Sequence, residues 1–310
     1  MMRSIFLCLL SALPLFCGEI EDYFKPVTDK SGSHQMRNID FIYMINLDER
    51  PEKFAKCVEA LAPYNIHPCR FSAVNGWKLS LEAINDLGVK YAPWMQDDHM
   101  GTYYAPERDF QSDHEIVHVI GRTYFCHCFS RGSMGIVLSH LSILQDAYDS
   151  GYETIWVMED DIEIIRDPHL LSDLIEELDD LVGKKGWDVL FTDRDTKDQM
   201  GKYVICESFA WRPNFTPLNP YRFAEKQEIS PDLRKIGSRY GAYSMIIRRS
   251  GMKKLLDFIK NYQIFLPYDM EYTLPSSIRL FTVTEDVVST QPRALSDNGS
   301  PNYEKREAGE

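Results

Sequence analysis

The sequence has no stretch in which lysine and arginine are interleaved with aromatic residues, and basic residues are in the minority. It contains 34 lysines and arginines against 47 aspartates and glutamates, which gives a formal net charge of −13. Because nucleic-acid binding depends largely on neutralising phosphates, we do not expect nucleic acid as a partner. An acidic protein that binds an anionic diphosphate needs a divalent cation as a bridge, so carboxylate clusters become the features of interest.

The sequence also lacks an apolar run long enough to cross a bilayer. Residues 5–16 form an apolar run of about a dozen residues after Met-Met-Arg, whereas a membrane-spanning helix needs roughly 20. We therefore expect residues 1–20 to be a cleaved secretory signal, with a short membrane anchor as the alternative. Either segment implies a location in the secretory pathway, in the periplasm or at a membrane, on a side that the sequence leaves open.

Cysteine is too sparse and too irregularly spaced for a disulfide framework. Five cysteines lie beyond the N-terminal segment, and a chain of 310 residues that is 44% hydrophobic can bury a large core without cross-links. In an oxidising compartment, Cys57 with Cys69 or Cys126 with Cys206 remain possible pairs.

The pattern of apolar residues predicts one α/β domain over residues 39–298, between a flexible lead-in at 21–38 and a tail at 299–310. No internal repeat is visible. A strand at 39–47, a helix at 52–62 and a strand at 71–74 form a β-α-β unit, which is typical of a parallel sheet covered by helices. The later expected elements are helices at 136–149, 169–182 and 251–259 and strands at 154–158, 188–192 and 243–247. The remaining segment, 85–131, is expected to be an irregular insertion that shapes a site.

Glu159-Asp160-Asp161, the first acidic cluster, directly follows an expected strand. Ligands of such sheets bind beyond the carboxyl ends of the strands. On an extended backbone Glu159 and Asp161 point to one face and Asp160 to the other. Two carboxylates on one side suit Mn²⁺ or Mg²⁺, with substrate phosphates completing the shell. The alternative is three acids that merely solvate a strand end.

Asp193-Arg194-Asp195, the second acidic cluster, also follows an apolar strand. It is a candidate for the metal site, for a second source of metal ligands, or for a solvated turn. Because Arg194 and Lys197 partly neutralise it, we rank it behind the first acidic cluster.

His114-Glu115-Ile116-Val117-His118 matches the zinc-protease pattern and makes a zinc hydrolase the sharpest alternative. That motif needs both histidines on one helical face, yet residues 116–124 are β-branched and favour a strand. We therefore interpret the match as chance. Cys126-His127-Cys128 is too tightly spaced for a usual zinc site and is interpreted as core or disulfide.

Two single residues are further candidates. His140 lies on the helix expected at 136–149, where it either faces the site or packs in the core. Asp269 follows an apolar stretch and a proline turn, which is a place for a rigidly held carboxylate or for an ordinary surface acid.

Several stretches, taken in order, resemble glycosyltransferase family 25, the lipopolysaccharide-biosynthesis and procollagen-galactosyltransferase-like group. They span residues 39–298 and include Ile45-Asn46-Leu47-Asp48-Glu49-Arg50, Ala73-Val74-Asn75-Gly76, Leu138-Ser139-His140, Met158 with the first acidic cluster, Pro267-Tyr268-Asp269 and Ser296-Asp297.

The resemblance implies a GT-A-like fold and metal-assisted transfer of a hexose, such as galactose, with inversion. The donor would be a UDP-sugar, and the acceptor a glycan, a lipopolysaccharide or a protein hydroxyl. It implies Glu159 and Asp161 as ligands of Mn²⁺ or Mg²⁺ and Asp269 as the general base. The donor-binding residues that it implies are Asn46, Arg50, Asn75, Gly76, Ser139, His140 and Asp160. A catalytically silent glycan-binding or interaction protein of the same fold is the main alternative.

Overall fold

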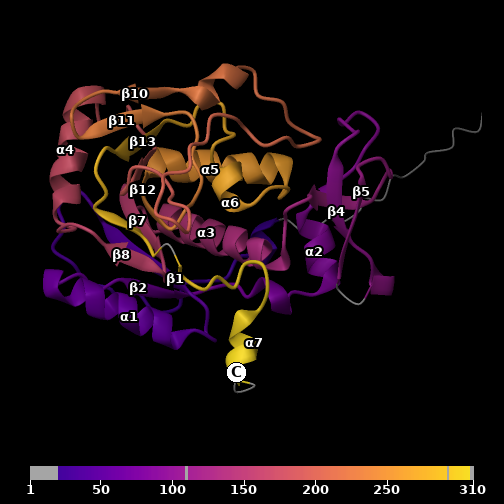
Figure 1. Ribbon diagram of the computed structural model, residues 1–310, viewed down its shortest axis with the longest axis horizontal. Helices are drawn as coiled ribbons and strands as arrows, with labels where there is room; N and C mark the ends of the chain where they lie inside the picture. Colours follow the sequence, from indigo (N-terminus) through magenta and orange to yellow (C-terminus); the bar gives the residue numbers. More distant parts are fainter. Residues whose placement is uncertain (1–19, 109–110, 292, 308–310) are drawn as a thin grey trace, which may run out of the picture.

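The structure is a computed structural model that describes residues 20–108, 111–291 and 293–307. The expected N-terminal signal or anchor therefore lies outside the described residues, apart from Ile20. The centre of the protein is an eight-stranded sheet with the order β10-β11-β13-β9-β12-β7-β1-β2 (Figure 1). Its strands are β1 (Phe41–Asn46), β2 (Cys69–Ser72), β7 (Thr154–Glu159), β9 (Val189–Phe191), β10 (Lys226–Glu228), β11 (Leu233–Ile236), β12 (Ser244–Arg248) and β13 (Leu280–Val283).

The central sheet is mixed rather than fully parallel. β1 pairs in parallel with β2 and β7, and β13 pairs in parallel with β9. β12 runs antiparallel between β7 and β9. Two parallel neighbouring strands need a crossover connection, which is usually a helix. The connection from β9 to its antiparallel neighbour β12, residues 192–243, contains the β10–β11 hairpin and no α-helix. The carboxyl ends of β1, β2, β7, β9 and β13 still meet at one edge of the sheet.

Helices cover both faces of this sheet, as the alternation of elements predicted. On one face, α3 and α5 bury side chains against Tyr43, Val157 and Met245. On the other face, α1 and α4 pack against Met44 and Trp156. Neighbouring strand residues thus supply the two cores in turn, because successive side chains of a strand point to opposite faces. The helices are α1 (Pro51–Leu61), α2 (Leu81–Leu87), α3 (Arg131–Asp149), α4 (Leu170–Val182), α5 (Arg249–Tyr262), α6 (Tyr268–Glu271) and α7 (Asn302–Glu307).

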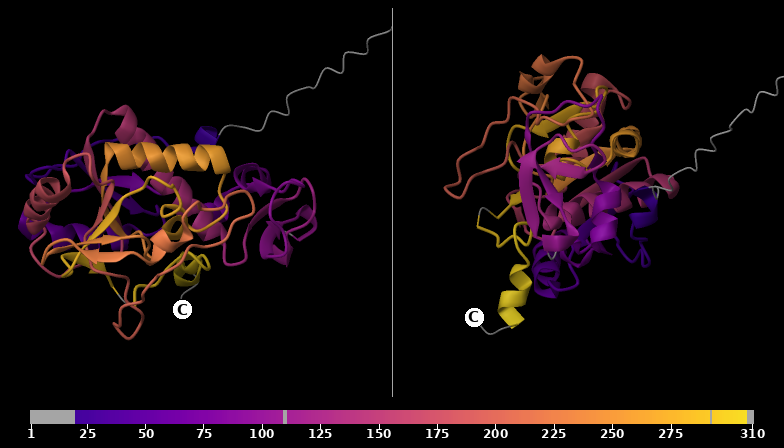
Figure 2. Two further views of the ribbon diagram at one scale, coloured as in Figure 1. Left: turned by 90° about the horizontal axis from the view of Figure 1, so that it is seen from above. Right: turned by 90° about the vertical axis from the view of Figure 1, so that its right-hand side faces the viewer.

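The segment at 85–131 is more regular than the sequence predicted. It forms a four-stranded antiparallel sheet of the order β3-β6-β4-β5, which stands beside the central sheet with α2 (Figures 1 and 2). Its strands are short and differ in burial, since β6 is buried whereas β5 is exposed or half-buried, so they share no continuous apolar pattern along the sequence. They are β3 (Val89–Lys90), β4 (Met100–Tyr104), β5 (Ser112–Ile116) and β6 (Thr123–Cys126).

The remaining elements are short. β8 (Ile162–Ile164) and β14 (Val288–Thr290) form a two-stranded sheet next to the edge where β7 ends. Among the residues that the structure describes, no helix has the length and apolar character needed to cross a membrane. The 3₁₀ helices are η1 (Ile20–Tyr23), η2 (Ala62–Tyr64), η3 (Gly76–Lys78), η4 (Pro106–Arg108) and η5 (Pro220–Ala224).

Candidate functional site

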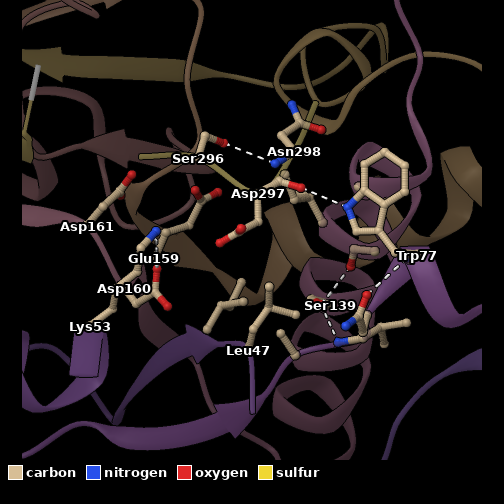
Figure 3. Close-up of a pocket in the computed structure, with 18 residues that line it drawn as sticks. Leu47, Lys53, Trp77, Ser139, Glu159, Asp160, Asp161, Ser296, Asp297 and Asn298 are labelled. Carbon is tan, nitrogen blue, oxygen red and sulfur yellow. Dashed lines mark hydrogen bonds and ion pairs between the residues drawn. The ribbon is translucent and has the colours of Figure 1, made fainter. Parts of the chain in front are cut away.

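A pocket opens where β1 and β7 end, at the carboxyl edge of the central sheet (Figure 3). It encloses about 660 Å³ of empty space, including open solvent at its mouth. Its walls also include the loop after β2, the N-terminal half of α3 and a segment near the C-terminus. The lining residues are Ile45, Leu47, Lys53, Ala73, Val74, Asn75, Gly76, Trp77, Gly132, Gly135, Ile136, Ser139, Glu159, Asp160, Asp161, Ser296, Asp297 and Asn298.

The first acidic cluster lies in this pocket with all three of its members. β7 ends at Glu159, and the chain turns through Asp160 and Asp161 before β8 begins. The expected alternation, with Asp160 facing away, is therefore wrong, because it assumed an extended backbone beyond the strand. Figure 3 shows the three side chains together on one side of the pocket.

The carboxylates of the first acidic cluster are poorly compensated. Burial raises the pKa of Asp160. Burial, together with the charges of Glu159 and Asp160, raises the pKa of Asp161 to about 7. Lys53 is the one basic residue that lines the pocket, and its Nζ lies 3.8 Å from Asp160 Oδ1. Asp161 Oδ1 is buried and has no hydrogen-bond partner. Clustered carboxylates with an unpartnered buried oxygen fit a hard divalent cation.

The described residues contain no ready-made metal site. Nowhere in 20–108, 111–291 or 293–307 do three or more His, Cys, Asp or Glu side chains converge as a ready-made site.

Asn46 and Arg50, the expected donor-binding residues at the end of β1, lie behind the pocket wall. The Asn46 amide donates to Asp160 Oδ2 at 2.6 Å. The guanidinium of Arg50 is buried and donates to both carboxylate oxygens of Asp297, at 2.7 and 2.8 Å. Both residues thus orient acids that line the pocket, and neither lines it itself.

Asn75, Gly76 and Ser139 do line the pocket, where the loop after β2 touches α3. A Cβ on Gly76 would lie 1.8 Å from the Arg131 carbonyl oxygen, so this approach requires glycine. Ser139 Oγ accepts from Val74 N–H at 2.9 Å and thereby ties the helix to the same loop. Asn75 uses its amide oxygen to cap η3. These contacts fix the position of the wall relative to α3.

His140 lies on α3 and contacts the first acidic cluster from behind. Its ring stacks on Tyr268 with 4.1 Å between the centroids, and its Nε2 lies 3.2 Å from Glu159 Oε1. The side chain is buried, and Nδ1 has no partner. His140 thus packs in the core and orients a pocket carboxylate, and it does not line the pocket itself.

Asp269 lies in the first turn of α6 and lines a different cavity, of about 390 Å³, together with Cys206 and Tyr240. Its Oδ2 accepts from Gly241 N–H at 3.0 Å. Burial raises its pKa, and the negative charge of Glu159 acts in the same direction. Asp269 is therefore a rigidly held carboxylate. It interacts electrostatically with Glu159 but does not line the same pocket as the first acidic cluster.

The second acidic cluster is a buried ion-pair network. Asp193 Oδ1 lies 2.9 Å from Arg239 Nη1, and Asp193 also accepts from the Tyr243 hydroxyl. Asp195 pairs with Arg234 at 2.8 Å. Because both acids are buried and held by arginines, the cluster is neither a solvated turn nor an open metal site.

The zinc-protease pattern lies on a strand and not on a helix. His114 is part of β5, and His118 lies just beyond its end. Each ring contacts its own hairpin, His114 Nδ1 at 3.1 Å from Thr102 Oγ1 and His118 Nδ1 at 2.6 Å from Ile116 O. The helical face that the motif requires does not form, which agrees with the interpretation of this match as chance, and residues 117–122 form a loop in place of the expected strand.

The described cysteines form no disulfide. Cys57, Cys69, Cys126, Cys128 and Cys206 are free thiols, so neither Cys57–Cys69 nor Cys126–Cys206 is a pair. The thiol of Cys69 instead donates to the Asp29 carbonyl, and Cys206 donates to its own loop.

Lys53, Trp77 and Asp297 are pocket residues that the sequence did not single out as site residues. Trp77 directly follows the Asn75-Gly76 turn, and its indole N–H donates to the Asp297 carbonyl at 2.8 Å. Asp297 belongs to one of the resembling stretches, which is a signal that could have identified it. Lys53 belongs to no motif.

Comparison with known proteins shows that residues 39–272 match the family described as glycosyltransferase family 25 (LPS biosynthesis protein). The chain is 28% identical over 156 residues to "Glycosyltransferase 25 family member" of Aedes aegypti, covering 50% of this chain and 21% of that protein. It is 26% identical over 231 residues to "Inactive glycosyltransferase 25 family member 3" of Homo sapiens, covering 74% of this chain and 31% of that protein.

The chain thus spans about a fifth to a third of the length of these curated relatives. Among solved structures, it is similar to one titled "Crystal Structure of A197 from STIV", with 10% identity and a TM-score of 0.37. That alignment covers 85% of this chain and 91% of the other. The similarity is too low to bear on function.

Proposed function

The chain belongs to glycosyltransferase family 25, and we propose that it transfers a hexose, with galactose as the first candidate, from a UDP-sugar. The acceptor would be a hydroxyl of a glycan, a lipopolysaccharide or a protein, and the anomeric carbon would be inverted. The observation that carries this proposal is the pocket at the end of β7, which combines the three acids of the first acidic cluster, and Asp297 beside them, with a single lysine. Such a wall binds a diphosphate only together with a cation.

Glu159 and Asp161 would hold a Mn²⁺ or Mg²⁺ ion, with Asp160 beside them. When bound, the ion supplies positive charge for the leaving diphosphate. His140 orients Glu159 through its Nε2, and Asn46 orients Asp160. The nucleoside would lie along the opposite wall, where Trp77 offers an aromatic face (Figure 3).

Asp269 would act as the general base. Inversion requires one group that accepts the proton of the acceptor hydroxyl while the oxygen attacks the anomeric carbon. The N–H group of Gly241 holds the carboxylate of Asp269 in one orientation. The raised pKa of Asp269 makes it a stronger base than an exposed aspartate.

The experiment that tests the donor site is calorimetric titration of UDP into the protein with and without Mn²⁺. We expect binding that requires Mn²⁺ and that disappears in Asp161→Ala. Asp180→Ala is the matched control, because Asp180 is exposed on α4 and does not line the pocket. Failure of the folded wild-type protein to bind UDP under either condition would contradict the proposed donor site.

A second candidate function is a catalytically silent protein of the same fold. It is favoured by the relatives from Homo sapiens and Mus musculus that are named inactive. Release of UDP from a panel of UDP-hexoses distinguishes the two, because a silent protein binds the donor without hydrolysing or transferring it. Turnover that requires Asp269 would exclude the silent alternative.

A further inference from the structure

Cys126 and Cys128 place two thiols side by side at the end of β6. Their Sγ atoms are 3.3 Å apart. A turn holds them there, because the N–H of Phe129 donates to the Cys126 carbonyl at 3.0 Å. The side chain of Cys126 is buried in the core, whereas Cys128 is exposed. The pair therefore consists of one thiol that solvent reagents can reach and one that is held directly behind it.

The other described cysteines do not share this arrangement. Cys57, Cys69 and Cys206 are each buried, and none of them contacts another thiol within the described part of the chain. A soluble reagent would thus meet Cys128 first, and Cys126 is the nearest group that could resolve the product.

We propose that Cys126 and Cys128 are a thiol-oxidation site that closes reversibly into an intramolecular disulfide by exchange with a low-molecular-weight disulfide. The Cys128 thiolate attacks one sulfur of the reagent RSSR, forms a mixed disulfide and releases RS⁻. The sulfur of Cys126 then attacks Cys128 Sγ and expels the second RS⁻, which takes up the Cys126 proton. One reagent disulfide is reduced to two thiols, and two protein thiols are oxidised to one disulfide.

The chemistry of both sulfurs agrees with these roles. The hydrogen bond from Cys126 lowers the pKa of Cys128 to about 6, and the nearby His127 acts in the same direction. The same hydrogen bond and burial raise the pKa of Cys126. The exposed sulfur is thus a thiolate at neutral pH, and the thiolate is the nucleophile in disulfide exchange. Bond formation requires the sulfurs to approach to about 2.05 Å, a short movement for two side chains in one turn.

Closure of the pair would reach the loop that carries Asp269. The N–H of Cys126 donates to the Phe265 carbonyl at 2.8 Å. The N–H groups of Phe265 and Leu266 donate to Glu271, which lies in the same short helix as Asp269. A shift of Cys126 therefore moves the hydrogen-bonded segment at Phe265 and Leu266 that holds α6 in place. This consequence rests on the proposed function, since a misplacement of about 1 Å at a reacting group can cost about 100-fold in rate.

The chemical test uses the full chain and oxidised glutathione, followed by alkylation and tryptic digestion. Cleavage after Arg122 and Arg131 yields the peptide 123–131, which contains Cys126 and Cys128 and no other cysteine. After oxidation we expect this peptide to escape alkylation and to weigh two hydrogen atoms less than the unmodified peptide, and to carry two alkyl groups when dithiothreitol is added before alkylation. Cys126→Ser should instead keep a glutathione adduct on Cys128, and Cys128→Ser should give no product in this peptide.

Two results would overturn the site itself: a peptide 123–131 that carries two alkyl groups after treatment with oxidised glutathione, or a stable glutathione adduct in the wild-type chain. The effect on Asp269 is tested separately by release of UDP from UDP-galactose. We expect oxidation to lower the wild-type rate up to about 100-fold, reversibly, and to leave Cys128→Ser unaffected. Full activity of the cross-linked protein would overturn the link to Asp269. Absence of turnover in the reduced protein would instead contradict the proposed function while the mass shift still stood.

Discussion

Two acidic clusters follow two buried strands of the same sheet, yet their surroundings differ. The first, at the end of β7, lines a pocket in which the one lysine, Lys53, lies 3.8 Å from Asp160. The second, at the end of β9, is enclosed, with Arg239 at 2.9 Å from Asp193. Burial raises the pKa of Asp193 too, but the charge of Arg239 opposes it.

The difference shows that an acidic motif acquires its role from the cations around it. In the second cluster the fold supplies the cations as arginine side chains, so the acids stabilise the structure. In the first cluster, the part of the chain that the structure describes supplies one lysine for three acids. A bound divalent ion, as we propose, would offset that charge. The following experiments test this contrast, beginning with the largest expected effect.

The largest effect is expected for Asp269, a lone carboxylate outside both clusters. Asp269→Ala should lower the rate of hexose transfer by about 10²–10⁴, because a positioned base is lost, while UDP binding persists. The measurement is the steady-state rate together with the calorimetric affinity for UDP. Because burial raises the pKa of Asp269, the wild-type rate should begin to fall, as pH decreases, at a higher pH than an ordinary aspartate would cause. A variant that keeps most of its turnover would remove Asp269 from the mechanism.

The second effect concerns stability and the second acidic cluster. Asp193→Ala leaves the buried guanidinium of Arg239 unpaired, so the free energy of unfolding should fall by about 3–5 kcal/mol. Urea denaturation measures this change. The fraction that remains folded should bind UDP with Mn²⁺ as the wild-type protein does. A loss of UDP affinity without destabilisation would mean that the two clusters have the opposite roles.

The third effect is the stabilisation that ligands give through the first acidic cluster. With UDP and Mn²⁺ at about 100 times the dissociation constant, the wild-type protein should gain about 2.7 kcal/mol. Asp161→Ala should gain almost nothing, although it should be at least as stable as the wild-type protein without ligand. Thermal unfolding with and without both ligands gives the comparison, and Asp180→Ala should behave like the wild-type protein.

The smallest effect is a pH dependence of stability without divalent ions. The pKa of Asp161 is about 7 in the folded chain and near the ordinary value of 3.8 in the unfolded chain. Between these values the folded state binds more protons, so this group raises the free energy of unfolding as pH falls from about 8 to 4. We expect roughly 1–2 kcal/mol after allowing for solvent screening. For Asp161→Asn, the free energy of unfolding should depend less on pH. Identical profiles for both proteins would mean that the pKa of Asp161 is not raised in the folded chain.

Much of the fold could be predicted from the sequence. The elements that were expected lie close to their expected positions, because apolar periodicity and turn residues act over a few neighbouring positions; they are β1, α1, β2, α3, β7, α4, β9, β12 and α5. The same local reasoning failed at 85–131, where short strands are stabilised by pairing with each other and not by a pattern of their own. It also missed that β12 runs antiparallel, since strand direction depends on how a long connection returns.

The candidate site was predictable only in part. The first acidic cluster and the Asn75-Gly76 turn were identified as motifs, and both line the pocket. Arg50 was expected at the nucleotide, but it holds Asp297, which is 247 residues away in the sequence. No local pattern indicates such a partner.

By itself the sequence determined which acids follow which strands, because the carboxyl end of a strand is marked by its own apolar residues and by the turn that follows. Only the tertiary structure decided which of those acids would be neutralised. Arg239 reaches Asp193 across 46 positions, whereas no arginine of the described chain pairs with the first acidic cluster. Electrostatic interactions act through space over a few ångströms, so the role of a charge depends on the neighbours that folding brings to it.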